Sequence, residues 1–261
     1  MKKFEFTGEI IAISFEKTLH RIRAIINIVD RAGTVIVKAG QLGGWLEKEE
    51  NLSQDDDAWV YDNAMVYDNA MVYDHAQVSD NARVYGNARV YGDACVYNDA
   101  RVYGKAWICG DTWIYNDARV YDKATICGDA SIYGNARVYG NVRVSDNARV
   151  YGNACVYGNA SIYGNARVCG DADVKKLNNY LTVGPIGSRN DMVTFFCNAK
   201  GVIKVKCGCF IGSIDAFLKK VTSTHGDSKH AIAYRAAAAL AMAQIDTTVM
   251  DVKLLNGKDA Q

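Results

Sequence analysis

The sequence predicts a mainly β protein built around a parallel β-solenoid, and three observations predict it. Every sixth residue from Val60 to Val174 is Val or Ile, over twenty consecutive positions. The residue two places before each of these is small, almost always Ala. The second and third residues after each are mostly Gly, Asn or Asp, which tolerate the positive φ angles of tight turns. Six residues cannot hold a helix and a turn, and propeller blades need about 40, so short strands joined by turns remain.

The composition limits the class of protein. The 261 residues carry 30 Lys and Arg against 29 Asp and Glu, a formal net charge of +1, so bulk charge predicts no particular partner. No run approaches 18 apolar residues, and the first residues, MKKFEFTGEI, are charged, so we expect neither a membrane span nor an export signal. Eight irregularly spaced cysteines predict free thiols in a cytoplasmic protein.

Residues 1–51 lack the six-residue period and form the predicted N-terminal β cap. The stretches KFEFTGEI, HRIRAIINIV and TVIVKA predict short strands separated by turns. The first coil of a solenoid exposes unpaired backbone groups, so a segment that covers this end is needed.

Residues 52–174 form the predicted solenoid, with the repeat A-x-V-Y-[GDN]-[ND]. Alternation along a strand places Ala and Val on one side and x and Tyr on the other, so Ala and Val fill the interior. Three repeats make one triangular coil, and residues three repeats apart then lie directly above one another. Coils rise by about 4.8 Å each, so stability comes mainly from stacking between neighbours.

The repeat resembles the hexapeptide-repeat family, in which an aliphatic residue is followed four places later by a small one, as in Val60 and Ala64. The stretch AGQLGGWLEKEENLSQDDDAWVYDNA, residues 39–64, is also similar to the segment before the first coil in a bacterial and phage subset of that family. The resemblance implies a left-handed parallel β-helix of about 20 repeats. Such proteins are commonly trimers, so a trimer is the first expectation and a dimer the alternative.

One outward face, face 1, is unusually regular. Its tyrosine column comprises Tyr67, Tyr85, Tyr103, Tyr121, Tyr139 and Tyr157, and its arginine column comprises Arg83, Arg101, Arg119 and Arg137. One interpretation is structural: Tyr suits strands, Arg stacks on Tyr by cation–π contact, and corner aspartates neutralise the charge. The other is a binding face, because aromatic and guanidinium groups dominate interface hot spots and anion recognition.

The expected partner of this face is a protein or another copy of the chain. An anionic small molecule is a further candidate. The repeats of residues 58–174 hold 10 Lys and Arg against 13 Asp, so they lack the basic field that nucleic-acid binding needs, and we expect no nucleic-acid partner.

An acyltransferase is the enzymatic alternative. The resemblance implies a histidine general base beside the coils and a loop that interrupts the repeats. The twenty repeats have no insertion, and His75, the only histidine among them, stands at a corner where neighbouring repeats have Asn. We therefore predict a turn residue at His75, no catalytic residue and no cofactor.

Residues 175–261 form the predicted C-terminal α+β module. NNYLTVGPIGS, MVTFFCN and GVIKVKCG predict three strands. Ser213 predicts the start of a helix that ends at Gly226, and Asp227 or Ser228 the start of an alanine-rich helix. The module loosely resembles short phage and prophage segments that carry GPIGSR, CGCF and HGD.

The module also contains a candidate ligand site. Its members are Ser188, Arg189, Cys207, Cys209, His225 and His230. The stretch GPIGSRND offers backbone amides and Arg189 to an anion, although a glycine-rich strand connection is the favoured explanation. Cys-x-Cys is not the usual zinc spacing, and a Cys–His nucleophile pair lacks an orienting residue, so we predict no metal.

Together these features predict a non-enzymatic β-helical binding protein. The phage-like resemblance suggests an antagonist of a host defence protein, or a protein that sequesters an anionic signal. A structural oligomeric scaffold is the remaining alternative.

Overall fold

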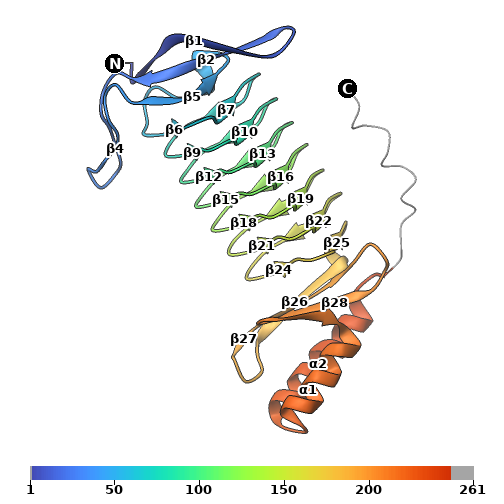
Figure 1. Cartoon of the computed structure of the whole chain (residues 1–261). Coiled ribbons are helices and arrows are strands. Elements are labelled where there is room, and N and C mark those ends of the chain that lie inside the picture. Colours follow the sequence, from blue (N-terminus) through green and yellow to red (C-terminus); the bar gives the residue numbers. More distant parts are fainter. Residues whose placement is uncertain (1, 248–261) are drawn as a thin grey trace. The chain divides into compact units, whose positions relative to one another are not determined.

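The computed structural model describes residues 2–247 and divides them into two compact units. Unit 1 contains residues up to 170 together with Lys175–Leu177, and unit 2 contains Asp171–Val174 together with the residues from 178 onward. The predicted fold class is confirmed: an N-terminal sheet, a parallel β-solenoid of about seven turns, and a C-terminal module with a sheet and two helices (Figure 1). Within residues 2–247, no helix combines the length and apolarity needed to cross a membrane.

The N-terminal sheet continues one sheet of the solenoid. Strand β1 (Phe4–Ser14) pairs antiparallel with β2 (Lys17–Ala24), and β2 pairs antiparallel with β5 (Leu42–Leu46). Strand β5 then pairs in parallel with β7 (Met65–Val66) of the first coil. The cap therefore satisfies the backbone groups that the first coil would expose. A separate hairpin, β3 (Ile28–Val29) and β4 (Val35–Val37), and a 3₁₀ turn, Glu49–Asn51, complete this segment.

Each solenoid strand is two residues long, and the strands stack into three parallel sheets, one on each face. Face 1 contains β7, β10 (Arg83–Val84), β13 (Arg101–Val102), β16 (Arg119–Val120), β19 (Arg137–Val138) and β22 (Cys155–Val156). Face 2 contains β6 (Trp59–Val60), β9 (Gln77–Val78), β12 (Cys95–Val96), β15 (Trp113–Ile114), β18 (Ser131–Ile132), β21 (Arg149–Val150) and β24 (Arg167–Val168). Face 3 contains β8 (Met71–Val72), β11 (Arg89–Val90), β14 (Trp107–Ile108), β17 (Thr125–Ile126), β20 (Arg143–Val144) and β23 (Ser161–Ile162).

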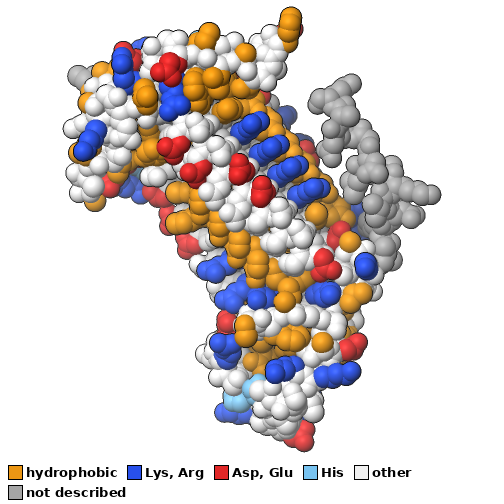
Figure 2. Space-filling model, in the orientation of Figure 1, with side chains coloured by type: hydrophobic (Ala, Val, Ile, Leu, Met, Phe, Trp, Pro, Cys, Tyr) orange, Lys and Arg blue, Asp and Glu red, His pale blue; other side chains and the backbone are white. Residues whose placement is uncertain are grey.

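Backbone hydrogen bonds fix a register of three repeats between coils. Arg83 N donates to Ala100 O at 2.9 Å, and Tyr85 N donates to Val102 O at 3.0 Å. The Ala and Val of each repeat point inward and are fully buried, as the alternation predicts. The outward residues form columns along the solenoid, visible as rows of one colour in Figure 2.

The exceptions to alanine are accommodated inside. Thr112 takes an alanine position and is completely buried, and its Oγ1 donates to Cys109 O at 2.6 Å. Its hydroxyl therefore pairs with a backbone carbonyl, which removes the cost of burying it unpaired.

Unit 2 is a four-stranded antiparallel sheet with two helices. The strand order is β26 (Tyr180–Ile186), β27 (Asp191–Cys197), β28 (Ile203–Cys207) and β29 (Phe210–Ser213). The short strand β25 (Asp173–Val174) contacts β27, and a 3₁₀ turn, Leu177–Asn179, precedes β26. Strand β29 was not predicted, because its four residues, FIGS, carry no alternating pattern of their own.

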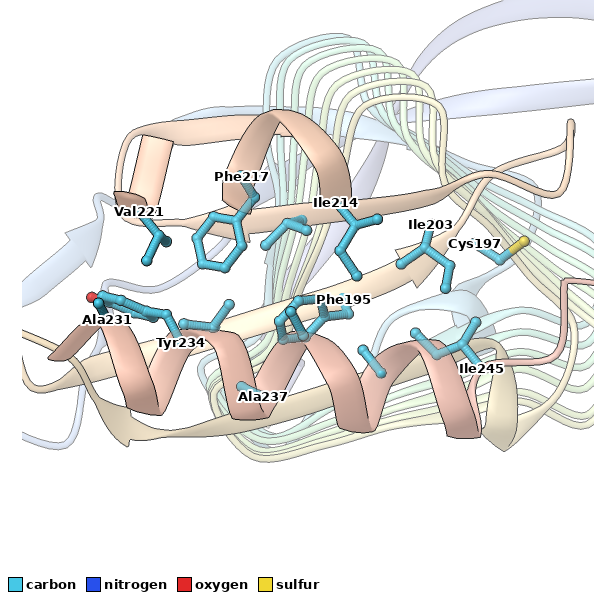
Figure 3. Packing of buried hydrophobic residues seen from close by; sticks show 14 residues of the cluster. Phe195, Cys197, Ile203, Ile214, Phe217, Val221, Ala231, Tyr234, Ala237 and Ile245 are labelled. Carbon is cyan, nitrogen blue, oxygen red and sulfur yellow. The ribbon is translucent and has the colours of Figure 1, made fainter. Parts of the chain in front are cut away.

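The helix caps of unit 2 follow the predicted residues. Helix α1 (Ile214–His225) begins at Ser213, whose side chain accepts from Ala216 N, and it ends at Gly226. Helix α2 (Lys229–Gln244) begins at Ser228, which accepts from Ala231 N. Figure 3 shows the core between the helices and the sheet, where Phe195, Phe217 and Tyr234 meet alanines of α2. The small alanine side chains allow this close packing.

Two glycines of β5 allow the cap to approach the first coil. A Cβ added at Gly44 would lie 2.6 Å from both Ala64 O and Val60 Cγ1, and one at Gly43 would lie 2.7 Å from Val60 O. The GGW segment is therefore a steric requirement of the junction.

We expect Gly44→Ala to destabilise unit 1 by about 3 kcal/mol, because the backbone carbonyl of Ala64 cannot move aside without breaking the coil register. The midpoint of urea denaturation measures this. The control is Gly164→Ala, where φ is +65° but nothing lies within 4 Å of the added Cβ, so only about 1 kcal/mol of backbone strain is expected. Equal effects of the two substitutions would contradict the steric explanation.

Candidate functional site

Face 1 holds its arginines in a continuous column. Parallel pairing of β10, β13, β16 and β19 sets Arg83 opposite Arg101, Arg101 opposite Arg119 and Arg119 opposite Arg137. All four side chains are exposed. A column of basic side chains runs along the solenoid in Figure 2. The register therefore places these four residues on one face, as the sequence predicts.

The tyrosines beside them form one aromatic stack. From Tyr67 to Tyr157, neighbouring ring centroids lie 4.7 to 5.2 Å apart, with 3 to 9° between ring planes. Lys17 Nζ lies 5.0 Å from the ring centroid of Tyr67, and Lys175 Nζ lies 6.0 Å from that of Tyr157. Ring faces inside the stack are therefore covered, and the two end rings face lysines. A ligand can reach the ring edges but cannot insert between the rings.

The phenols contribute no charge to this face at neutral pH. Burial and the neighbouring Tyr85 raise the pKa of Tyr67 to about 12, and burial also raises the pKa of Tyr85. The charge of face 1 is therefore set mainly by the arginine column.

The structure corrects one part of the structural interpretation of face 1. Among residues 2–247, none forms a hydrogen bond, ion pair or cation–π contact with Arg83, Arg101, Arg119 or Arg137. No corner aspartate among residues 2–247 forms an ion pair with these guanidinium groups. The tyrosine rings stack on one another and leave no ring face for an arginine. Four like charges thus stand in a row with no countercharge from the described residues 2–247.

A second column, which carries the opposite charge, follows the corner between faces 3 and 2. We define the acidic column as Asp93, Asp111 and Asp129, which succeed one another at every third repeat, once in each coil. Desolvation and the neighbouring carboxylates of Asp93 and Asp129 raise the pKa of Asp111. Asp111 and Asp129 are exposed and form no ion pair with any residue in the described range 2–247.

The same corner continues toward the cap as His75 and Asp57. His75 Nδ1 pairs with Asp57 Oδ1, and His75 Nε2 accepts from Arg31 Nε at 2.8 Å. Arg31 Nη1 also donates to Asp93 Oδ2 at 3.2 Å. The backbone of His75 lies in a turn, as predicted, but its ring is held on both sides. The period of the coil identifies Asp57 as its neighbour, whereas nothing in the sequence indicates that Arg31 reaches it.

Two cavities adjoin this network. They measure about 380 and 280 Å³ and share Asp30, Arg31, Asp57 and His75 in their walls. Lys3 lines the larger one and is buried, with Nζ donating to Asp56 O at 2.7 Å and Ala58 O at 2.8 Å. Burial lowers the pKa of Lys3 to about 8, against the opposing attraction of three nearby aspartates.

The C-terminal candidates meet only in part. The hydroxyl of Tyr234 contacts Ser188 and Cys207, so a residue that sequence reasoning missed links two predicted members. Burial raises the pKa of the Cys207 thiol, which disfavours a thiolate nucleophile. The ring centroids of His225 and His230 lie 6.2 Å apart, and the thiol of Cys209 is exposed. Arg189 is exposed and lies beside Gly208.

Two further observations concern the cysteines and histidines. No group of three or more His, Cys, Asp or Glu suited to a metal ion occurs in the part of the chain that the structure describes. All eight cysteines are free thiols, including Cys109 and Cys127, which the register places one above the other.

Comparison with known proteins supports the architecture. A family model described as the YdcK beta solenoid repeat matches residues 58–74, 76–92, 82–97, 130–146, 142–158 and 148–164. These stretches of the chain are similar to that repeat, and the match agrees with the observed coils. A search of curated protein sequences finds no match.

We expect the free energy of unfolding to depend on Lys3 at alkaline pH. The folded state loses the Lys3 proton near pH 8 and the unfolded state near 10.5, so between these values the unfolded state binds more protons and folding gains stability as pH rises. Relative to Lys3→Met, the wild type should gain about 2 kcal/mol over this interval in urea denaturation. An NMR titration of labelled lysine gives the pKa directly, and a value near 10.5 would contradict the prediction.

We also expect Asp111→Asn to raise Tm by about 1 to 2 °C at neutral pH. A raised carboxyl pKa means that ionisation costs the folded state stability as pH rises, and asparagine removes the charge. Stacked asparagines are already accommodated, since Asn98 Nδ2 donates to Asn116 Oδ1 at 3.0 Å. Thermal melts test this. The difference in Tm between variant and wild type should vanish at about pH 3, where the Asp111 carboxyl group is protonated in both the folded and the unfolded state.

Proposed function

We propose that this protein is a non-enzymatic interaction protein whose face 1 binds an acidic surface of another protein. The observation that carries the proposal is the arginine column, whose four exposed guanidinium groups have no countercharge among residues 2–247. Like charges directly opposite each other on neighbouring strands are destabilising. A partner that supplies carboxylates would remove this cost and form charge-assisted hydrogen bonds.

The rigidity of the face supports the same proposal. The coil register fixes the backbone under each arginine, and the tyrosine stack fixes the adjoining surface. The backbone and the stacked tyrosine rings therefore lose little freedom on binding, which favours affinity. The covered ring faces argue against a nucleic-acid partner, because base stacking needs an open aromatic face.

An anionic small molecule is a second candidate for the same side of the solenoid. A cavity of about 420 Å³ lies at the adjoining corner, and its walls include Lys105 and Lys123. Asp122 and Asn141 also line this cavity, so its two lysines outnumber its one carboxylate and favour an anion such as a phosphate or carboxylate.

The biological setting that we propose follows from resemblance. A phage-derived protein in the cytoplasm would use face 1 to antagonise a host defence protein or to sequester an anionic signal.

Acyl transfer is the enzymatic alternative, and the pairing of Asp57 with His75 beside a cavity of about 280 Å³ favours it. Against it, His75 Nε2 already accepts from Arg31, so its lone pair is not available to a substrate hydroxyl. Release of free coenzyme A from acetyl-coenzyme A across a panel of acceptors tests this alternative. Turnover by the wild type that His75→Ala abolishes would establish it.

We expect the double substitution Arg101→Glu with Arg119→Glu to weaken binding of labelled poly-L-glutamate by about tenfold or more at low salt. Reversing two central charges replaces attraction by repulsion at the middle of the column. Fluorescence anisotropy gives the Kd. The matched control is Arg143→Glu with Arg149→Glu, two exposed arginines of faces 3 and 2, which should change Kd by less than about twofold. Equal weakening by both pairs would show that only net charge matters.

A further inference from the structure

The acidic column and the arginine column lie on opposite sides of the solenoid. A three-sided coil has one corner opposite each face, and the corner between faces 3 and 2 is opposite face 1. Asp111 belongs to the same turn of the solenoid as Arg101, and Asp129 to the same turn as Arg119. The two columns therefore run parallel to each other along the axis, out of reach of each other within one molecule.

Both columns have the same spacing. Neighbouring members are three repeats apart in each, so their rise per step is the rise of one coil. Rings on face 1 measure this repeat at 4.7 to 5.2 Å. An acidic surface that matches the arginine column at every step must carry carboxylates at this interval, and the acidic column of a second copy does so without adjustment.

Each column is also unfavourable alone. The arginines have no countercharge among residues 2–247, and desolvation together with the carboxylate neighbours raises the pKa of Asp111. Arg31 of the cap already donates a hydrogen bond to Asp93. Asp111 and Asp129 are therefore the exposed members of the acidic column that can meet a partner. They project from turns, so they form a ridge that long arginine side chains on a flat face can meet.

We propose that the acidic column of one copy binds face 1 of a second copy through Asp111 and Asp129 against the arginine column. This inference rests on the proposed function, since it names the partner of the same face. The contact is heterologous, because different surfaces meet. The two surfaces of this contact, the acidic column and face 1, lie on opposite sides of one molecule. The contact therefore does not close into a small ring, and the assembly grows with concentration.

Sedimentation velocity over a concentration series at about 50 mM salt tests the proposal. The weight-average sedimentation coefficient of the full chain should rise with concentration, and about 0.5 M salt should reverse the rise. Arg101→Glu with Arg119→Glu removes one half of the contact, and Asp111→Lys with Asp129→Lys removes the other. Each double variant alone should remain monomeric at concentrations about tenfold above those at which the wild type associates.

Mixing two charge-removing double variants, Arg101→Gln with Arg119→Gln and Asp111→Asn with Asp129→Asn, gives the sharpest result, because reversed charges would attract each other and restore the second contact. The first retains the acidic column and the second retains the arginine column, so one intact contact forms between them. The mixture should give a one-to-one dimer that grows no further. A mixture that remains monomeric while the wild type associates would overturn the proposal.

The matched control is Asp99→Lys with Asp117→Lys. These aspartates are also exposed and one coil apart, but they occupy the corner beside the arginine column. This variant should associate like the wild type, and its melting curve, with those of the other variants, reports folding. Loss of association in it, with association retained in the Asp111 and Asp129 variant, would refute the assignment of the ridge.

The poly-L-glutamate measurement separates this inference from the proposed function. If the wild type remains monomeric but its binding of poly-L-glutamate depends on Arg101 and Arg119, the partner is not a second copy and the proposed function stands. If neither association nor binding depends on these arginines, both fail.

Discussion

The backbone hydrogen bonds between coils are the constraint on which the rest of the structure depends. They join each coil of the solenoid to the next in a fixed register, as when Arg101 N donates to Ala118 O at 2.9 Å. This register forces inward positions to repeat Ala and Val, because each must pack on its own counterpart. It also places outward residues of one type directly above one another, which is favourable for stacked tyrosines and unfavourable for the like charges of arginine and aspartate. The charged columns are therefore consequences of the register, and a partner of opposite charge lowers the repulsion within each column.

The solenoid was predictable from the sequence because its contacts follow a fixed interval. The buried Ala and Val, the two columns of face 1 and the vertical position of Cys109 over Cys127 all follow from counting three repeats to a coil. The caps at Ser213 and Gly226 were predictable for another reason, since they depend on residues within one helical turn. The phage subset was an expectation of another kind, based on resemblance, and the partner was expected from the composition of face 1.

Contacts between segments of unrelated period could not be predicted in this way. Arg31 reaches His75 from a hairpin whose path no local pattern specifies, and Lys3 is buried under the backbone of Asp56 and Ala58. In unit 2, Tyr234 lies against the position where Gly187 lacks a side chain, and this fit links Ser188 to Cys207 across the module. Each case depends on packing between segments far apart in the sequence. Side chains that match no motif in the sequence therefore take part in a polar network.

The coil length has a consequence for how such a protein can change in evolution. A duplication or deletion of three whole repeats adds or removes one coil and leaves every outward residue on its own face. Duplication or deletion of a single repeat preserves the buried Ala and Val but moves every later repeat to the next face. The arginines after that point then join a column of other residues. Lineages can therefore lengthen the charged columns in whole coils without redesigning the fold. Insertion of one repeat would keep the buried core and its contribution to stability, but it would break the columns of outward residues.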